Sequence, residues 1–378
     1  MVQVTGKITP MQRLGILGGG QLGRMLIQAA MNYDIYVQVL DPDAEAPCHT
    51  VCNKFVQGSL TDYETVLQFG QEVDVITIEI EHVNVEALKA LQKQGKKVYP
   101  QPEIIELIQD KGNQKDWYVK HSVPTAPFTL GTAEYTGKFP VMQKLRRLGY
   151  DGKGVKKIIS VRDLSKQFTE PAFFEEFIPF QKEIAVIVAR NQRGDIATYP
   201  VVEMKFHLEA HLVDWLMAPA RVSKTIAEQA HSVAMRIAEE LKLVGVLAVE
   251  MFVTTAGDVL VNEIAPRPHN SGHHTIEANE TSQYDQHLRA IFNWPLGATT
   301  ARQTAVMINL LGEAGYEGVA NYQNLSHVLA EAGVYVHLYG KVYTRPMRKM
   351  GHITVLADDA QTALAKALAL KQRLKVIS

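Results

Sequence analysis

The first hundred residues alternate short apolar runs with stretches whose apolar residues recur at helical spacing. The apolar runs cover residues 14–17, 35–40, 73–80 and 97–99, and the helical stretches cover 24–31, 62–70 and 85–94. Strands that alternate with helices pair in parallel, because each helix carries the chain back to the same end of the sheet. We therefore predict an N-terminal α/β domain whose parallel sheet is covered by helices.

Pro100 and Pro102 interrupt this pattern and mark a boundary. A helical stretch over 103–121 follows, and then strands over 141–144, 156–160, 172–177 and 183–189. Apolar spacing predicts a long amphipathic helix over 223–241. A hairpin is predicted to join 246–253 to 258–262, and the tail to contain strands over 305–310, 334–338 and 353–356 and a last helix over 360–373. The chain is thus predicted to combine α/β and α+β domains.

Composition restricts the function more than the fold. The chain has 378 residues, with 39 Lys and Arg against 40 Asp and Glu. This balance argues against a protein that coats nucleic acid, which would carry a basic excess. Two cysteines, Cys48 and Cys52, offer no disulfide framework, and MVQVTGKITPMQRLG lacks the apolar run of a secretory leader. We expect a cytoplasmic protein without a membrane-spanning segment.

The first glycine turn, Gly18-x-Gly20-x-x-Gly23, follows a strand and opens a helix, and Asp41 ends the next strand. This is the context of a dinucleotide-binding fingerprint, in which a helix N-terminus attracts phosphate. The same turn also suits another anionic ligand, or serves tight packing alone. The sequence leaves these three interpretations open.

A second glycine-rich stretch begins at Lys144 and ends at Gly154, with the sequence KLRRLGYDGKG. Its glycines and four cations suit a loop that closes over a polyphosphate, although the pattern is not a Walker A motif. The alternative is a solvated hairpin turn.

Two acidic residues are expected to lie side by side on the predicted hairpin. Glu250 belongs to the first strand, and Asn262-Glu263 to the second. Paired carboxylates on neighbouring strands repel unless a cation lies between them, and Mg²⁺ prefers a few such oxygens together with nucleotide phosphates. Surface acids are the alternative, but the apolar residues around them argue against full solvation.

Three further clusters are dense in polar groups. The loop Pro266-Arg-Pro-His-Asn-Ser-Gly-His-His274 follows the hairpin, and its three histidines make a zinc site conceivable. A basic cluster from Lys341 to His352 suits a phosphomonoester or a solvated face. The acidic and apolar stretch from Glu175 to Ile178, followed by Glu183, suits the adenine and ribose of a nucleotide.

Together these motifs resemble the ATP-grasp superfamily. Within it, GGGQLGRML, GYDGKG, VNEIAPRPHNSGHHT and YGK…RPMRKMGHI are similar to the 5-(carboxyamino)imidazole ribonucleotide synthase family, over nearly the whole chain and in the same order. The resemblance implies an ATP-grasp fold in three parts. These are a Rossmann-like pre-ATP-grasp domain (1–110), an ATP-grasp domain (111–300, with a lid-like part over 111–178) and a small C-terminal domain (301–378).

The resemblance also implies a ligase of purine biosynthesis that uses ATP, bicarbonate and Mg²⁺ to carboxylate aminoimidazole ribonucleotide through carboxyphosphate. It suggests a cytoplasmic homodimer whose partners are small molecules, with no nucleic acid or membrane partner. The rivals are a formate-dependent glycinamide ribonucleotide transformylase, a biotin carboxylase-like enzyme, a nicotinamide-dependent oxidoreductase and a non-catalytic nucleotide-binding module.

By the same resemblance, each motif receives a role. Mg²⁺ is expected on Glu250 and Glu263. ATP is expected on Lys111, Lys144, Gly149, Tyr150, Asp151, Gly152, Lys153, Gly154, Glu175, Glu176, Phe177, Ile178, Glu183, His207, Asn262 and Glu263. The ribonucleotide is expected on Gln21, Leu22, Glu79, Glu81, Arg267, His269, Asn270, Ser271, Lys341 and Arg348. The expected catalytic residues are Asp151, Arg267, Tyr150 and His269, with Asp151 accepting the proton of the amine. Val155 departs from the family pattern, where many members carry Gln.

Overall fold

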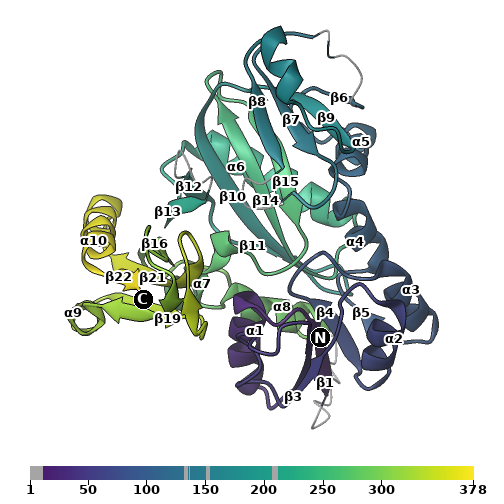
Figure 1. Cartoon of the computed structure of the whole chain (residues 1–378), viewed down its shortest axis with the longest axis vertical. Coiled ribbons are helices and arrows are strands. Elements are labelled where there is room, and N and C mark those ends of the chain that lie inside the picture. The colour runs from purple at the N-terminus through teal and green to yellow at the C-terminus, as the bar shows by residue number, and fades with distance from the viewer. Residues whose placement is uncertain (1–11, 132–134, 136, 150–153, 207–211) are drawn as a thin grey trace, which may run out of the picture.

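The computed structural model describes residues 12–131, 135, 137–149, 154–206 and 212–378. Three large elements of architecture are visible in Figure 1: an N-terminal α/β unit, a four-stranded sheet at the opposite end, and a long central sheet that continues into the C-terminal strands. None of the helices built from the described residues is long and apolar enough to span a lipid bilayer.

The N-terminal sheet is parallel throughout, in the order β3-β2-β1-β4-β5. Its strands are β1 (Arg13–Leu17), β2 (Tyr36–Asp41), β3 (Lys54–Gln57), β4 (Val75–Ile78) and β5 (Lys97–Val98), and its helices are α1 (Gln21–Met31), α2 (Tyr63–Gln71) and α3 (Val85–Lys93). The predicted alternation is confirmed. The edge strand β3 was not predicted, because its short run KFVQ is only half apolar.

The predicted helix over 103–121 is wrong as a single element. It is divided into α4 (Pro102–Ile108) and α5 (Lys111–Lys120). The break falls at Asp110, whose carboxylate accepts hydrogen bonds from the backbone N–H groups of Gly112 (2.9 Å) and Asn113 (3.2 Å). An aspartate in this position caps the start of a new helix. The break therefore places Lys111 at the first turn of α5.

The four-stranded sheet is antiparallel, in the order β6-β9-β7-β8. Its members are β6 (Phe128–Leu130), β7 (Val141–Leu145), β8 (Val155–Ile158) and β9 (Ala172–Glu176), with a 3₁₀ turn η1 (Val161–Lys166) between β8 and β9. Lys144 pairs with Val155, so both residues lie where β7 and β8 approach the glycine loop between them.

The central sheet has nine strands, along the path β15-β14-β10-β12-β13-β16-β21-β19 with β11 beside β10. It runs through the predicted boundary at residue 300 into the C-terminal strands. Its strands are β10 (Phe180–Arg190), β11 (Ile196–Thr198), β12 (Val202–Phe206), β13 (Val213–Ala218), β14 (Gly245–Thr254), β15 (Val259–Ala265), β16 (Thr304–Leu311), β19 (Val334–Leu338) and β21 (Lys349–Ala357).

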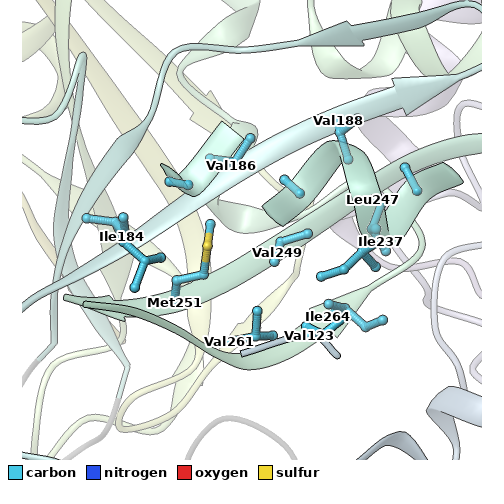
Figure 2. Packing of buried hydrophobic residues seen from close by; sticks show 14 of the residues in the cluster. Val123, Ile184, Val186, Val188, Ile237, Leu247, Val249, Met251, Val261 and Ile264 are labelled. Carbon is cyan, nitrogen blue, oxygen red and sulfur yellow. The ribbon is translucent and has the colours of Figure 1, made fainter. Parts of the chain in front are cut away.

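Helix α6 (Lys224–Glu240) covers one face of β10 and β14. Figure 2 shows Val186, Val188, Val249 and Ile237 converging in this buried layer. Because side chains alternate along a strand, Glu250 points to the opposite face from its neighbours Val249 and Met251. The apolar layer under α6 therefore orients the acidic residues of the other face.

The remaining elements connect the units. α7 (Thr275–Ala278), α8 (Gln283–Ile291) and the 3₁₀ turn η2 (Asn270–Gly272) follow the central hairpin. α10 (Ala360–Arg373) packs on β16 and β21, while the smaller C-terminal elements are β17 (Gly318–Val319), β18 (Asn321–Gln323), α9 (Leu325–Leu329), β20 (Tyr343–Thr344) and β22 (Lys375–Ile377).

His287 of α8 joins the N-terminal sheet to the central one. The backbone N–H of Val246 donates to its Nδ1 (3.2 Å), and Nε2 lies 2.8 Å from Thr77 Oγ1. Since Nδ1 accepts a hydrogen bond, the ring is neutral and its proton is on Nε2, which donates to the threonine. This bridge sets β4 against β14, the two strands that lead to Glu79 and Glu250.

Candidate active site

A cavity of about 930 Å³ lies between the four-stranded sheet and the central sheet. This volume lies within the usual range for a small-molecule site. Residues from α5, β7, β9, β10, β14 and β15 and from the loop after β15 line it. Twelve of the predicted site residues meet here: Lys111, Lys144, Glu175, Glu176, Phe177, Ile178, Glu183, Glu250, Asn262, Glu263, His269 and Asn270.

Glu250 and Glu263 are register partners on β14 and β15, as their spacing predicted. The register shifts directly after this pair, since Met251 pairs with Val261, and Asn262 is the additional residue of a β-bulge. A bulge turns two successive side chains toward one face. It explains why Asn262 and Glu263, which regular alternation would separate, both line the cavity.

Charged neighbours shift the pKa values of the two carboxylates in opposite directions. Lys111 Nζ donates to Glu263 Oε2 at 2.6 Å, and this lysine lowers the pKa of Glu263. Burial, together with the charges of Glu263 and Glu183, raises the pKa of Glu250. His269 Nε2 lies 3.7 Å from Glu250 Oε1. Glu263 is therefore ionised, whereas ionisation of Glu250 requires a further cation nearby.

Lys144 is held on two sides. Its Nζ donates to Asn262 Oδ1 (3.0 Å) and lies 2.5 Å from Glu175 Oε1. Glu175 and Lys115 form an ion pair in which both side chains are only 3% exposed. Burial alone would raise the pKa of Glu175, but Lys144 and Lys115 outweigh it and hold the pKa below the ordinary value. Two lysines on one carboxylate leave a net positive charge at the cavity wall.

The other end of the cavity is more apolar. Phe177 lies under Lys157, whose Nζ is 3.9 Å from the ring centroid, and Phe180 stacks on Phe252 at 4.7 Å. Burial raises the pKa of Glu183 to about 7, against the opposing charges of Lys205 and Lys144. An apolar slot beside a buried carboxyl group can accept a planar base and a hydroxyl group.

The first glycine turn binds an internal carboxylate. The backbone N–H of Leu22, at the start of α1, donates to Glu79 Oε1 (3.2 Å), and that of Gly19 donates to Asp41 Oδ2 (2.6 Å). A Cβ at Gly20 would lie 2.4 Å from Glu79 Oε1. The turn geometry thus accommodates Glu79. A dinucleotide phosphate at this helix N-terminus would have to displace two carboxylates, which argues against the nicotinamide interpretation.

Other predicted ribonucleotide contacts gather around Glu79. Arg267 Nε donates to Glu81 Oε1 at 2.8 Å. Burial raises the pKa of Glu79, while the charges of Arg267 and Lys341 oppose that shift. Gln21 is the first residue of α1. This second cluster adjoins the cavity through the loop that carries both Arg267 and His269.

His269 and Ser271 form a local pair within that loop. The backbone N–H of Ser271 donates to His269 Nδ1 (3.3 Å), and Ser271 Oγ lies 2.9 Å from the same atom. With Nδ1 accepting, the neutral ring carries its proton on Nε2, which faces Glu250. Among the described residues, no group of three or more His, Cys, Asp or Glu could hold a metal, so the conceivable zinc site finds no support.

The two cations predicted to bind the phosphate have different surroundings. Lys341 Nζ donates to the carbonyl of Lys349 (2.7 Å), whereas Arg348 Nη1 donates to the carbonyl of Tyr343 (2.6 Å). Arg348 is absent from the cavity lining, while its neighbour Lys349 is part of it. The role of Arg348 remains a prediction.

Five predicted residues lie outside the described part of the chain: Tyr150, Asp151, Gly152, Lys153 and His207. The two ends of the glycine loop are described. Gly154 has φ = +78°, a conformation that favours glycine, and its carbonyl accepts a hydrogen bond from the N–H of Leu145 (2.8 Å). The loop therefore leaves β7 after Leu145 and rejoins β8 at Val155.

Comparison with known proteins follows this geometry. Three family models match: a ribonucleotide synthetase preATP-grasp domain (residues 11–109), an ATP-grasp domain (118–284) and a phosphoribosylaminoimidazole carboxylase C-terminal domain (305–366). The N5-carboxyaminoimidazole ribonucleotide synthase of Synechococcus elongatus is 37% identical over 386 residues, which cover 96% of each chain. The chain belongs to the N5-carboxyaminoimidazole ribonucleotide synthase family.

Solved structures agree with this membership. The synthetase from Thermotoga maritima has a TM-score of 0.90 and 43% identity, and the match covers 97% of this chain and 100% of that one. A synthase from Aspergillus clavatus, in complex with ADP and 5-aminoimidazole ribonucleotide, has a TM-score of 0.86 and 33% identity, covering 96% and 99%. The chain spans 64% and 65% of the length of the plant and Candida carboxylases that it also matches. The predicted ATP-grasp fold and ligase class are confirmed, and boundaries near 110 and 300 remain our proposal.

Several residues at the synthase cavity were missed by sequence reasoning. Lys115 neutralises Glu175. Glu203 accepts hydrogen bonds from the guanidinium (2.6 and 3.1 Å) and the backbone N–H (3.1 Å) of Arg221, and a fourth from Lys182 (2.8 Å). Lys349 lies in the basic cluster that the sequence analysis identified, but no role was predicted for this lysine. Lys115 and Glu203 belong to no local sequence motif, since their partners are distant along the chain.

Proposed function

We propose that this chain catalyses the ATP- and bicarbonate-dependent carboxylation of 5-aminoimidazole ribonucleotide on its exocyclic amine, releasing ADP and phosphate. One observation carries this proposal. A nucleotide-sized cavity, lined by Lys144 and the Glu250–Glu263 pair, adjoins the cluster around Glu79 and Arg267. The Aspergillus neighbour, a complex with ADP and 5-aminoimidazole ribonucleotide, supports the choice of substrates.

Glu250 and Glu263 fit a magnesium ion, with Asn262 beside them. These two carboxylates are register partners beside a β-bulge, one of them has a raised pKa, and a few such oxygens are what Mg²⁺ prefers. When bound with ATP, the ion would neutralise charge on the phosphates. Lys111, which is paired with Glu263 in this structure, would then be available to contact a phosphate oxygen.

The first chemical step transfers the γ-phosphoryl group of ATP to a bicarbonate oxygen, giving carboxyphosphate and ADP. Phosphoryl transfer depends mainly on positioning and on charge neutralisation. Lys144, held by Asn262 and Glu175, supplies a fixed cation, and the amides of the loop from Gly149 to Gly154 would cover the phosphates. The apolar slot around Phe177, at the other end of the cavity, suits the adenine.

The second step forms the new C–N bond. The amine attacks the carboxyl carbon of carboxyphosphate, or CO₂ released from it, phosphate departs, and the amine loses a proton. Arg267, whose guanidinium is braced by Glu81, offers positive charge to the carboxyl oxygens, and the Nε2–H of His269 offers a donor. Asp151 is our candidate for the proton acceptor, by its place in the GYDGKG motif.

The setting of the reaction is part of the proposal. Both cysteines are free thiols, as suits a reducing compartment, and we place the enzyme in the cytoplasm. Family resemblance further suggests a homodimer.

A substrate-dependent ATPase assay with product identification tests the function. ADP release should rise when bicarbonate and 5-aminoimidazole ribonucleotide are added together. A rise with formate and glycinamide ribonucleotide instead would identify the transformylase. Tight NADH binding without ATP binding would favour the oxidoreductase, and ATP binding without turnover the regulatory module.

The Asp151→Ala variant tests the proton acceptor. Loss of a general base typically costs about 10²–10⁴ in rate, so turnover should fall by at least about a hundredfold while ATP binding persists. Asp258→Ala, in the exposed turn between β14 and β15, is the matched control. Wild-type turnover in the Asp151 variant would remove it from the mechanism.

A further inference from the structure

Three imidazole rings stack in the interior beside the ribonucleotide cluster. The ring centroids of His273 and His352 are 4.8 Å apart with planes inclined by 26°, and those of His352 and His337 are 4.5 Å apart with planes inclined by 13°. His352 is fully buried and His273 is 1% exposed. His337 and His352 are cross-strand partners on β19 and β21, whereas His273 follows η2. The stack therefore connects the C-terminal strands to the loop after β15.

Each ring has polar contacts outside the stack. A hydrogen bond joins His273 Nδ1 to Tyr284 Oη (2.9 Å), and another joins His352 Nδ1 to Tyr339 Oη (3.0 Å). His273 Nδ1 also lies 3.4 Å from Gln283 Nε2. His337 Nε2 donates to Glu277 Oε1 (2.6 Å). His352 Nε2, by contrast, is buried without a hydrogen-bond partner in the part of the chain that the structure describes. On that side only the neighbouring rings determine where His352 lies.

One end of the stack supports the loop with the proposed carboxylation residues. Gln283 accepts a hydrogen bond from the backbone N–H of His269 (2.9 Å) and donates to its carbonyl (2.7 Å). A Cβ on Gly272 would lie 2.3 Å from Gln283 Oε1, so the loop wraps closely around this side chain. His273 ends this wrapped segment and presents its ring to His352.

The other end supports the lysine expected to bind the substrate phosphate. Lys341 Nζ lies 5.7 Å from the ring centroid of Tyr339, the residue that is hydrogen-bonded to His352. The same Nζ donates to the carbonyl of Lys349, at the start of the strand that contains His352. These two contacts of Lys341 thus lead to His352 through one intervening residue or strand.

Burial keeps the two inner rings of the stack, His273 and His352, uncharged. It lowers the pKa of His273 and of His352, and the neighbouring histidines lower both further. Neutral rings at this spacing attract one another face to face with an offset, which makes the stack a rigid spacer.

We propose that His352 is a positioning residue for the carboxylation reaction. Clamped between His273 and His337, it sets the distance between the loop that carries Arg267 and His269 and the segment that carries Lys341, so that one ribonucleotide contacts both. This inference rests on the proposed function, because it assigns the stack to the ribonucleotide and leaves ATP binding to the other cavity wall.

A matched pair of variants tests the stack. His352→Phe keeps a ring in the middle position, whereas His352→Leu keeps an apolar side chain but removes the ring, and both lose the bond to Tyr339. With 5-aminoimidazole ribonucleotide as probe, we expect His352→Leu to raise KM and the calorimetric Kd about tenfold, and His352→Phe by about threefold or less. KM for ATP should change by less than about twofold in both. His327→Ala, on the exposed side of α9, is the control.

The outcomes separate positioning from general damage. Equal rises in both KM values, or no difference between the Leu and Phe variants, would overturn the inference. If His352→Leu does not fold, His337→Leu decides, since it removes the outer ring that stacks on His352; an unchanged ribonucleotide affinity there counts against the proposal. If the wild type itself neither binds nor uses the ribonucleotide, the proposed function fails, and this inference fails with it.

Discussion

The contact between Gly20 and Glu79 makes the first glycine turn testable. Gly20 has φ = −76° and ψ = −164°, a conformation open to any L-residue, so alanine there adds no backbone strain. Its Cβ would nevertheless lie 2.4 Å from Glu79 Oε1, and the carboxylate would have to move away. The Gly20→Ala variant therefore tests what occupies the turn.

Moving Glu79 breaks the hydrogen bond from the N–H of Leu22. A hydrogen bond to a charged group contributes roughly 1.5–3 kcal/mol, so Gly20→Ala should lower the free energy of unfolding by about that amount. In a Glu79→Ala background the collision is gone, and the substitution should cost under about 1 kcal/mol, the effect of an alanine N-cap. Urea unfolding of the four proteins of this double-mutant cycle measures the coupling.

Equal costs of Gly20→Ala in the two backgrounds would refute the reasoning. They would mean that the turn excludes alanine for a reason unrelated to the carboxylate. The NADH affinity of the wild type provides an independent check, since an internal carboxylate at this helix start predicts none.

Three further predictions concern the metal, the nucleotide and the interior. Glu250→Gln should weaken Mg²⁺ binding in the presence of ADP by at least about tenfold without altering metal-free ADP binding, as measured by calorimetry. Lys144→Met should raise KM for ATP by about tenfold or more, while Lys120→Met on the exposed side of α5 should not. Burial lowers the pKa of His287 to about 3, so its ring stays neutral when folded but gains a proton below about pH 6.5 when unfolded. The contribution of His287 to the free energy of unfolding should therefore be complete above about pH 6.5 and fall by roughly 1.4 kcal/mol per pH unit below it. His287→Gln should make the measured slope shallower by about that amount in pH-dependent urea titrations.

Much of the fold was predictable where local patterns decide. Parallel pairing followed from the order of strands and helices, and helix α10 (Ala360–Arg373) has the predicted bounds. The pairing of Glu250 with Glu263 followed from the hairpin between them. Asp110 illustrates a local signal that was present but overlooked, since a helix-capping aspartate divides the predicted helix.

Other features had no local signal. The bulge at Asn262 depends on how β14 and β15 register, and it decides that Asn262 and Glu263 share one face. The pairing of Lys115 with Glu175 joins residues sixty positions apart, and the continuation of the central sheet past residue 300 depends on β13 pairing with β16.

The sequence by itself determined which chemistry this chain carries. Carboxylates on a hairpin, a basic glycine loop and a polar loop after the hairpin are fixed by residue type and short spacing, whatever the arrangement of the domains. Only the tertiary structure decided how charges are compensated. Glu79 lies against the first glycine turn, and Lys111 pairs with Glu263. The stacking of three histidines likewise depends on the tertiary structure. Burial and compensation depend on groups brought together from distant segments, because the cost of burying a charge is set by its neighbours in space.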